Sequence, residues 1–489
     1  MSEAEQPTIR PIDESEFRRS IARQRAVRDV VVSDVEMPRA ELAGVSIETA
    51  VFMLARMPEA RARGVKIKGT AFVGCDFRDA DFSQSELEDV SFVACDLTDA
   101  TFKGATLKHI GFLAAEDPPE PPKDADDPQA AIDAINLGDQ ESPESQDEEP
   151  EPPPPARCTR LARAVFDAAS ARDIIAKHAD LSEASFKSAT LAGFDIERGT
   201  LRGARFDAAS IGDIRLSRTS AEEAVFDHAA VAGGLIEATV LTGSSWAGAK
   251  LGAVHLLELD ATAIASAPAS VTGCGVERVN LSGLSLEGID AERLQVLEVE
   301  ARGTVLRRAR LAEAKAEHAV LVDAVLASAV LDGSIMAGCD LRGASLAGAS
   351  VTKLAAQACR LDGLDLAGLD LSGSQLAGCS LSGTKLGGAN ATECEFDRCD
   401  LRSASFDAAT LDGADLTGSD LRQASLAGAS LAGTTLSGAD LSGASLERAK
   451  IASADLSKLD LRSARLGGAG LNKCDLSGST LDGLDLAGC

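Results

Sequence analysis

The sequence predicts a solenoid of short repeats, and three observations lead to this prediction. First, an apolar residue recurs at every fifth position from Leu161 to Leu486, and Ser266 is the one polar member of this series. Second, small residues such as Ala164 and Ala404 recur two positions before it. Third, aromatic residues make up only 3% of the 489 residues, too few for a globular core of this size. A period of five fits neither a helix nor a flat strand, whereas a short period kept over hundreds of residues is typical of a solenoid.

The stretch Ala414–Leu446 reads ADLTGSDLRQASLAGASLAGTTLSGADLSGASL. It resembles the pentapeptide-repeat proteins, whose consensus is roughly Ala-Asp/Asn-Leu-x-x. The resemblance implies an all-β fold, a right-handed quadrilateral β-helix with four repeats per coil. It also implies that the apolar residue and the small residue both point inward, and that residues twenty apart lie on neighbouring coils.

The N-terminal residues 1–30 are interpreted as a tail followed by a capping helix. Residues 1–12 are expected to lack structure, and Asp13–Arg28 to be helical, because Asp13 and Glu16 have the spacing of a capping box. Phe17 and Ile21 share one face, which favours a cap over the open end of the solenoid. The alternative is that the arginines of this segment form a basic arm for a partner.

A first repeat array is predicted over residues 31–113. Within it, the stretch Glu48–Arg63 contains Met57-Pro58 and few turn residues, so a local helix that interrupts the coils is one interpretation.

Residues 114–157 are predicted to be a disordered, Pro-rich acidic linker. They hold a large share of the chain's net charge of −28. The linker contains an apolar island, Ala130–Gly138, interpreted either as a short helix on the solenoid wall or as a docking motif.

The second array is predicted over residues 158–489. Phe112 and Leu161 do not share a five-residue register. Two arrangements remain open, a loop ejected from one continuous solenoid and two separate stacks.

Twenty-residue spacing predicts ladders of aromatic side chains inside the coils. In the first array this ladder is Phe52, Phe72, Phe92 and Phe112. In the second array it is Phe166, Phe186, Phe206, Phe226 and Trp246, with the smaller Ser266 expected above the indole.

Ten of the 11 cysteines occupy the small inward column, and only Cys158 does not. Four of them are twenty apart, which predicts a straight ladder of buried thiols. Such a ladder spreads its sulfur atoms and cannot converge on one zinc ion. We therefore predict no metal site. The ten are Cys75, Cys95, Cys274, Cys339, Cys359, Cys379, Cys394, Cys399, Cys474 and Cys489.

Aspartates twenty apart are predicted to stack on the outer wall, and an arginine follows most of them two residues later. The aspartates are Asp400, Asp420, Asp440 and Asp460, and the arginines are Arg402, Arg422 and Arg462. Alone, the acids would resemble a row of DNA phosphates. With the arginines beside them, they predict a solvated wall that pairs its own charges.

No catalytic or cofactor-binding residue is assigned. The five histidines are interpreted as sharing no ladder with cysteines or carboxylates at ligand spacing. No nucleophile with a neighbouring base, phosphate-binding loop or dinucleotide-binding motif was found.

These observations predict a non-enzymatic scaffold for protein–protein interaction, with no direct binding of nucleic acid. Two alternatives come from the family resemblance: an accessory or effector protein of a type VI-like secretion system, and a DNA mimic that binds DNA gyrase. With no membrane span and no signal peptide in the sequence, a bacterial cytoplasmic location is expected. The final coil, which includes Leu484 and Leu486, is expected to form a homodimer interface.

Overall fold

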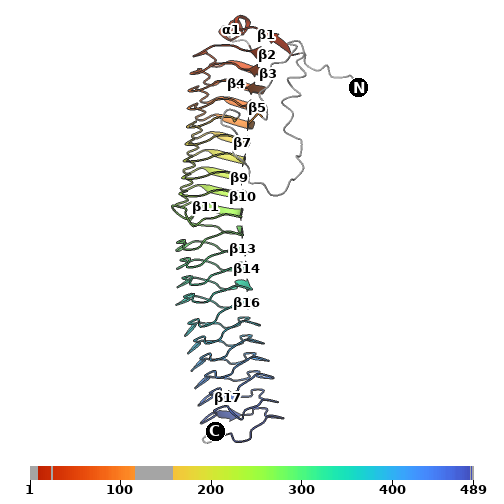
Figure 1. Ribbon diagram of the computed structural model, residues 1–489, viewed down its shortest axis with the longest axis vertical. Helices are drawn as coiled ribbons and strands as arrows, with labels where there is room; N and C mark the ends of the chain where they lie inside the picture. The colour runs from red at the N-terminus through yellow and green to blue at the C-terminus, as the bar shows by residue number, and fades with distance from the viewer. Residues whose placement is uncertain (1–8, 24–25, 116–157, 485, 487–488) are drawn as a thin grey trace, which may run out of the picture. The chain divides into compact units, whose positions relative to one another are not determined.

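The computed structural model describes residues 9–23, 26–115, 158–484, 486 and 489. These residues form a parallel β-solenoid with one short helix, which confirms the predicted fold class (Figure 1). That helix, nine residues long, falls short of what a membrane span requires.

The long strands lie in the N-terminal half, and short strands follow them. The elements are β1 (Arg10–Ile12), α1 (Glu14–Ala22), β2 (Val27–Ser33), β3 (Ser46–Met53), β4 (Lys66–Val73), β5 (Glu86–Val93), β6 (Thr106–Leu113), β7 (Ser170–Lys177), β8 (Thr190–Glu197), β9 (Ser210–Ser217), β10 (Ala230–Glu237), β11 (Lys250–Leu257), β12 (Gly275–Glu277), β13 (Gln295–Leu297), β14 (Lys315–Glu317), β15 (Ile335–Ala337), β16 (Ala355–Gln357), β17 (Lys450–Ala452) and β18 (Gly470–Asn472).

The chain divides into two compact units. The first comprises Met1–Lys250 and Ala263–Ser266, and the second comprises Leu251–Thr262 and Ala267–Cys489. This division does not coincide with the boundary between the two predicted arrays, because both ends of the linker at residues 114–157 belong to the first unit.

The first unit begins with a strand, not with an unstructured tail. β1 pairs in parallel with β2, with Arg10 opposite Val30 and Ile12 opposite Val32. The expectation that residues 1–12 lack structure is therefore wrong for Arg10–Ile12, while residues 1–8 lie outside the described residues. Pairing with β2 gives the first coil a neighbour for its backbone groups.

Helix α1 starts where the sequence predicted it but ends earlier. The Asp13 carboxylate accepts a hydrogen bond of 2.7 Å from the backbone N–H of Glu16, which caps the helix. The predicted end at Arg28 is wrong, because β2 already begins at Val27, a buried residue that pairs with Ile47 on the next coil. Pairing into the sheet thus overrides the helical tendency of the arginine-rich segment.

Helix α1 packs over the start of the phenylalanine ladder. Phe17 is fully buried, and its ring lies 5.4 Å from that of Phe52 in an edge-to-face arrangement. Two arginines of the predicted basic arm are engaged locally, Arg18 with Glu14 at 2.7 Å and Arg28 with Glu48 at 2.9 Å.

In the regular coils, neighbouring rungs pair residues that are twenty apart, and their backbone hydrogen bonds join residues 19 or 21 apart. In the second unit, the backbone N–H of Leu421 donates to the carbonyl of Asp440 at 2.8 Å, and that of Asp420 donates to the carbonyl of Cys399 at 2.9 Å. The backbone N–H of Ala424 donates a hydrogen bond of 2.9 Å to the carbonyl of Leu421, which closes a tight turn. This turn requires a left-handed residue, Gln423 with φ of 60°, and glycine fills the same place at Gly418.

The predicted aromatic ladders are present. The rings of Phe166, Phe186, Phe206, Phe226 and Trp246 stack in sequence at centroid distances of 4.0–4.8 Å. The rings of Phe52, Phe72, Phe92 and Phe112 stack likewise at 5.0–5.5 Å.

The coils continue across the linker within the first unit. β6 pairs with β7, with Thr106 opposite Ser170. The Phe102 ring stacks on Phe166 at 4.8 Å, and Arg163 forms an ion pair with Asp99 at 2.6 Å. The separation along the chain across this step is 64 residues instead of 20. Of the two arrangements that the sequence left open, the structure therefore shows a loop inserted into continuous coils.

The local helix considered for Glu48–Arg63 is absent. Ser46–Met53 forms β3, Glu36 pairs with Arg56, and Met57 is buried in the regular five-residue register. A helix would withdraw Phe52 and Met57 from the inward columns, so burial of these side chains favours the coil over the local preference.

The expected position of Ser266 is wrong by one residue. Ser266 pairs with Ser245, and its hydroxyl accepts from the Trp246 backbone N–H at 3.0 Å and meets the Ser245 hydroxyl at 2.8 Å. In the apolar column this hydroxyl would have been buried without a partner, which is unfavourable. The shift is local, because in the second unit Leu251 again donates to Ser270 in the regular pattern.

Replacing Leu421 with Asp tests the assignment of the inward column. Leu421 is fully buried between rungs, so a carboxylate there should cost several kcal/mol of unfolding free energy. We expect a clear fall in the melting temperature measured by circular dichroism. The control is Arg422→Ala on the outer wall, which should melt nearly as the wild type does. Equal melting of the two variants would contradict the assignment.

Candidate interaction surface

The outer wall of the second unit carries a ladder of paired aspartates and arginines, as the sequence predicted. The Arg402 guanidinium donates two hydrogen bonds to the Asp400 carboxylate, from Nε to Oδ1 at 2.7 Å and from Nη2 to Oδ2 at 2.6 Å. The same two-pronged pair recurs at Arg422 with Asp420 and at Arg462 with Asp460. We call this surface, Asp400 to Arg462, the Asp–Arg ladder.

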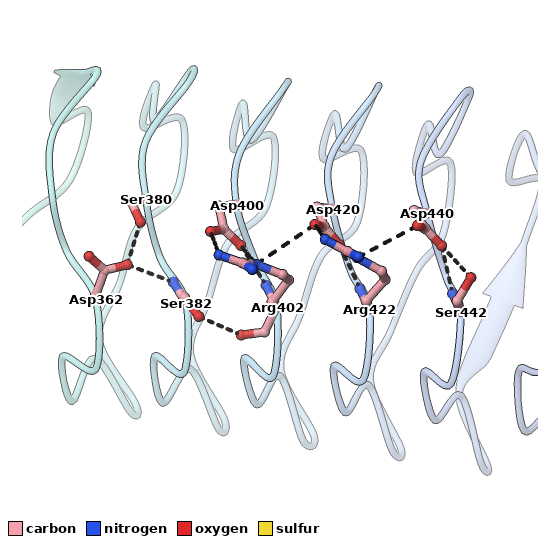
Figure 2. Close-up of polar contacts among 9 residues, drawn as sticks. All are labelled: Asp362, Ser380, Ser382, Asp400, Arg402, Asp420, Arg422, Asp440 and Ser442. Atoms are coloured by element: carbon pink, nitrogen blue, oxygen red, sulfur yellow. Dashed lines mark hydrogen bonds and ion pairs between the residues drawn. The ribbon is translucent and has the colours of Figure 1, made fainter.

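Arg402 and Arg422 also face the aspartate of the next rung. Arg402 Nε lies 3.8 Å from the Asp420 carboxylate, and Arg422 Nε lies 3.7 Å from that of Asp440. Figure 2 shows these side chains in a row along neighbouring rungs, with the guanidinium groups between successive carboxylates. Positive and negative charges thus alternate along the wall.

Hydroxyl groups also hold acids of this wall that have no arginine two residues later. Asp362 accepts from the Ser380 hydroxyl and from the Ser382 backbone N–H (Figure 2). Asp440 accepts from the Ser442 backbone N–H at 2.9 Å and from its hydroxyl at 2.5 Å. The carboxylates are therefore fixed in orientation even where no arginine follows two residues later.

The arginines also set the ionisation of the acids. Hydrogen bonding from Arg402 lowers the pKa of Asp400, and hydrogen bonding from Arg422 lowers the pKa of Asp420. At Asp460, the hydrogen bond from Arg462 lowers the pKa to about 2. Asp400, Asp420 and Asp460 are therefore ionised at neutral pH, and each is balanced by its own arginine.

A second column of acids, which the sequence reasoning missed, has no arginines beside it. Glu395, Asp415, Thr435, Asp455 and Asp475 lie on successive rungs of the second unit. Asp415, Asp455 and Asp475 accept from the residue two positions later, Thr417, Ser457 and Ser477 respectively. Within the described parts of the chain, no ion pair joins these acids to a basic side chain.

The signal for this acid–hydroxyl column was present in the sequence. The same twenty-residue spacing occurs, but Asp-x-Ser or Asp-x-Thr stands where the other wall has Asp-x-Arg. These neighbours donate a hydrogen bond without neutralising the charge. The second unit therefore has one balanced ladder and one acidic column.

The first unit has its own charged ladder, which alternates in sign from rung to rung. Glu88 lies between Lys68 at 2.9 Å and Lys108 at 2.5 Å. Hydrogen bonds from these two lysines, that from Lys108 being the stronger influence, lower the pKa of Glu88 to about 2.

His109 corrects the prediction that no histidine shares a ladder with carboxylates. Its Nδ1 lies 2.8 Å from Asp89 Oδ1, and its Nε2 lies 3.2 Å from Asp173 Oδ2. The insertion had hidden the second neighbour, because it separates His109 from Asp173 by 64 residues along the chain. In the ranges that the structure describes, no group of three or more histidine, cysteine, aspartate or glutamate side chains could hold a metal ion.

The predicted ladder of thiols is present in the second unit. Cys359 N–H points to Cys379 Sγ at 3.4 Å, and Cys399 Sγ donates to the Leu376 carbonyl at 2.8 Å. Burial raises the pKa of Cys399 to about 12. The Cys399 thiol therefore remains protonated at neutral pH and acts as a small buried side chain rather than a nucleophile.

Comparison with known proteins supports the repeat assignment. The family model described as pentapeptide repeats matches in eight copies over residues 75–110, 304–343, 324–355, 357–390, 385–423 and 424–462. No curated protein matches the chain.

Several solved structures are similar. HetL, a pentapeptide repeat protein involved in heterocyst differentiation regulation from the cyanobacterium Nostoc sp. strain PCC 7120, is 29% identical, with 44% of this chain and 88% of HetL covered and a TM-score of 0.31. Full-length QnrB1, a plasmid-mediated fluoroquinolone resistance protein, is 16% identical, with 56% and 92% covered and a TM-score of 0.20. A pentapeptide repeat protein from the Arabidopsis thaliana thylakoid lumen is 26% identical, with 26% and 66% covered and a TM-score of 0.12.

The pKa of Asp400 tests whether Arg402 controls its charge. In Arg402→Gln we expect the pKa of Asp400 to rise toward the ordinary range for aspartate, as measured by carboxyl-carbon NMR titration. A carboxylate with a lowered pKa in the folded state stabilises the fold at neutral pH, and this contribution is lost as the pH falls through that pKa. Arg402→Lys should restore only part of the shift, since lysine cannot form the two-pronged pair. An unchanged pKa in Arg402→Gln would refute this role.

Proposed function

We propose that this chain, which belongs to the pentapeptide-repeat proteins, is a non-enzymatic scaffold that binds a protein partner on the outer wall of its second unit. The Asp–Arg ladder is the observation that carries this proposal. The charged side chains project from a regular backbone and are fixed by paired hydrogen bonds. A partner would therefore meet an array of charges that is already ordered.

Preorganisation is what makes such a wall suitable for binding. Arg402, Arg422 and Arg462 lose little additional side-chain freedom on contact, because their aspartates already fix them. Alternating charges specify the register of a complementary surface more than they add raw affinity. A partner with charges repeated at the rung spacing of about 4.8 Å would match the ladder.

The acid–hydroxyl column gives the scaffold a second kind of surface. Asp415, Asp455 and Asp475 accept hydrogen bonds from hydroxyl-bearing residues and keep their net negative charge. A basic edge of the same partner would be attracted there. The two surfaces together would orient a partner on the unit, which neither could do alone.

Two other functions compete with this proposal. A gyrase-binding DNA mimic needs a run of exposed negative charge, and the arginines within the Asp–Arg ladder argue against it on that wall. A role beside a type VI-like secretion system is the other alternative, and it would be distinguished by the partner found. We further propose that the protein acts in the bacterial cytoplasm, in keeping with the sequence.

Cross-linking of the tagged chain in its native host, followed by mass spectrometry, tests the scaffold proposal. We expect a protein cross-linked at Lys458, two residues before Asp460 of the ladder, and at least tenfold less of it with Arg402→Ala/Arg422→Ala. The control Arg293→Ala/Arg308→Ala removes the same charge from other rungs and should keep the partner. Strong inhibition of gyrase supercoiling, abolished by neutralising Asp400, Asp420, Asp440 and Asp460, would replace the scaffold with the DNA mimic.

We also propose that the coil around Leu481 and Leu486 binds a second copy of the chain. These side chains are 37% and 45% exposed, whereas the corresponding Leu441 and Leu446 are buried. A two-fold contact would cover the same apolar surface on both copies and close the assembly.

Light scattering checks the proposed dimer. We expect a mass twice that of the 50.4 kDa chain, falling to the single-chain mass in Leu486→Asp. The matched change Val240→Asp, at a residue that is 47% exposed in the first unit, should leave the dimer intact. A single-chain mass for the wild type would rule out the dimer and favour a different protein on this coil.

A further inference from the structure

The outer wall of β3–β6 in the first unit carries a surface of apolar side chains. Phe52 and Phe72 stack inside the coil, so the residues that flank them in the strands point to the outer side. These flanking residues are apolar. We call the following set the apolar patch: Val51, Met53, Leu54, Ala71, Val73, Val93 and Leu113.

Strand register joins these residues into one surface. Met53 lies opposite Val73, Val73 opposite Val93, and Val93 opposite Leu113. A parallel column runs from Val51 to Ala71. The patch therefore crosses four consecutive strands and ends at Leu113, two residues before the described chain breaks at Ala115.

The patch differs from the wall beside it. Outward positions near the start of the same strands carry Lys68, Glu88 and Lys108, which pair with one another. In the patch Val51, Ala71 and Val73 are only 5–9% exposed, whereas Met53, Val93 and Leu113 are half-buried and Leu54 is 44% exposed. The patch is therefore accessible at Met53, Leu54, Val93 and Leu113. Leu54 lies over Gly74, where a Cβ atom would come within 2.8 Å of its Cδ2. Glycine at this place lets the apolar surface extend to Leu54.

We propose that the patch is the docking site for the apolar island Ala130–Gly138 of the same chain. Within residues 116–157, Ile132, Ile135 and Leu137 supply all of the isoleucine and leucine, and valine, methionine and aromatic residues do not occur. The flanking sequences are rich in proline and acid and have nothing comparable to bury. Apolar chemistry thus matches the island, and no other part of the insertion, to the patch.

Chain connectivity places the island within reach. The insertion leaves the coils directly after Leu113, at the edge of the patch. The patch spans about 15 Å, because neighbouring strands lie about 4.8 Å apart. Residues 116–129 can extend over about 45 Å, at roughly 3.3 Å per residue. Because both ends of the insertion belong to one unit, docking is intramolecular, so weak contacts suffice.

Docking would give the first unit a function of its own. It would hold the acidic flanks of the island against one wall and cover the apolar patch. The role of the patch is separate from the scaffold proposal, which rests on the second unit.

Hydrogen exchange followed by mass spectrometry on the full chain tests the docking. We expect amides of Ala130–Gly138 to exchange more slowly than those of residues 116–129 and 139–157, by on the order of tenfold. In Val93→Asp this difference should be lost. The control Val240→Asp, on an exposed residue of the same unit, should retain it.

A second measurement covers the case in which Val93→Asp fails to fold. Leu137→Asp lies outside the coils, and the chain has only five methionines, so the Met53 methyl signal can be followed by NMR. We expect that signal to shift in Leu137→Asp, while the Met336 signal stays in place. Uniform exchange across residues 116–157, or an unchanged Met53 signal, would overturn the proposal. Protection that grows with protein concentration would do so as well, by showing that a second copy supplies the island.

Discussion

The structure depends on backbone hydrogen bonds between neighbouring rungs, which place residues twenty apart opposite one another. Each such bond fixes which residues lie above one another, because a parallel ladder repeats the same register from strand to strand. With this register set, leucine meets leucine and phenylalanine meets phenylalanine along the interior. The few aromatic side chains stack on one another inside the coils, as Phe186 does with Phe166 and Phe206.

The same constraint creates the walls and the need to manage their charge. Outward residues twenty apart are neighbours whether or not their charges agree. The chain uses three arrangements: arginine beside aspartate in the Asp–Arg ladder, alternating sign from Lys68 to Lys108, and uncharged backbone N–H donors of Thr417 and Ser457 at Asp415 and Asp455. Only the third leaves net charge on the surface. The arrangement that a column uses therefore determines the pattern of charge that a partner would meet on that wall.

The coils contain two irregular steps, and at each one a local contact takes the place of a contact that the regular repeat would make. At the insertion, the pairing of Phe102 with Phe166 and of Arg163 with Asp99 keeps the rungs in register. At Ser266, hydrogen bonds to Ser245 and Trp246 compensate for a shift of one residue. In both cases side chains next to the irregular step make the contacts that the five-residue pattern would have supplied.

The sequence by itself determined the solenoid, the inward columns, the aromatic and thiol ladders, and the Asp–Arg pairs. All of these follow from a period of five and a spacing of twenty, which is local information repeated many times. Tertiary structure decided where strand pairing and burial override the local preferences of the sequence. Pairing with β1 and β3 ended α1 before Arg28, and burial of Met57 kept Glu48–Arg63 in the coil. The neighbours of His109 across the insertion depend on contacts between residues distant along the chain, and no local pattern encodes such contacts.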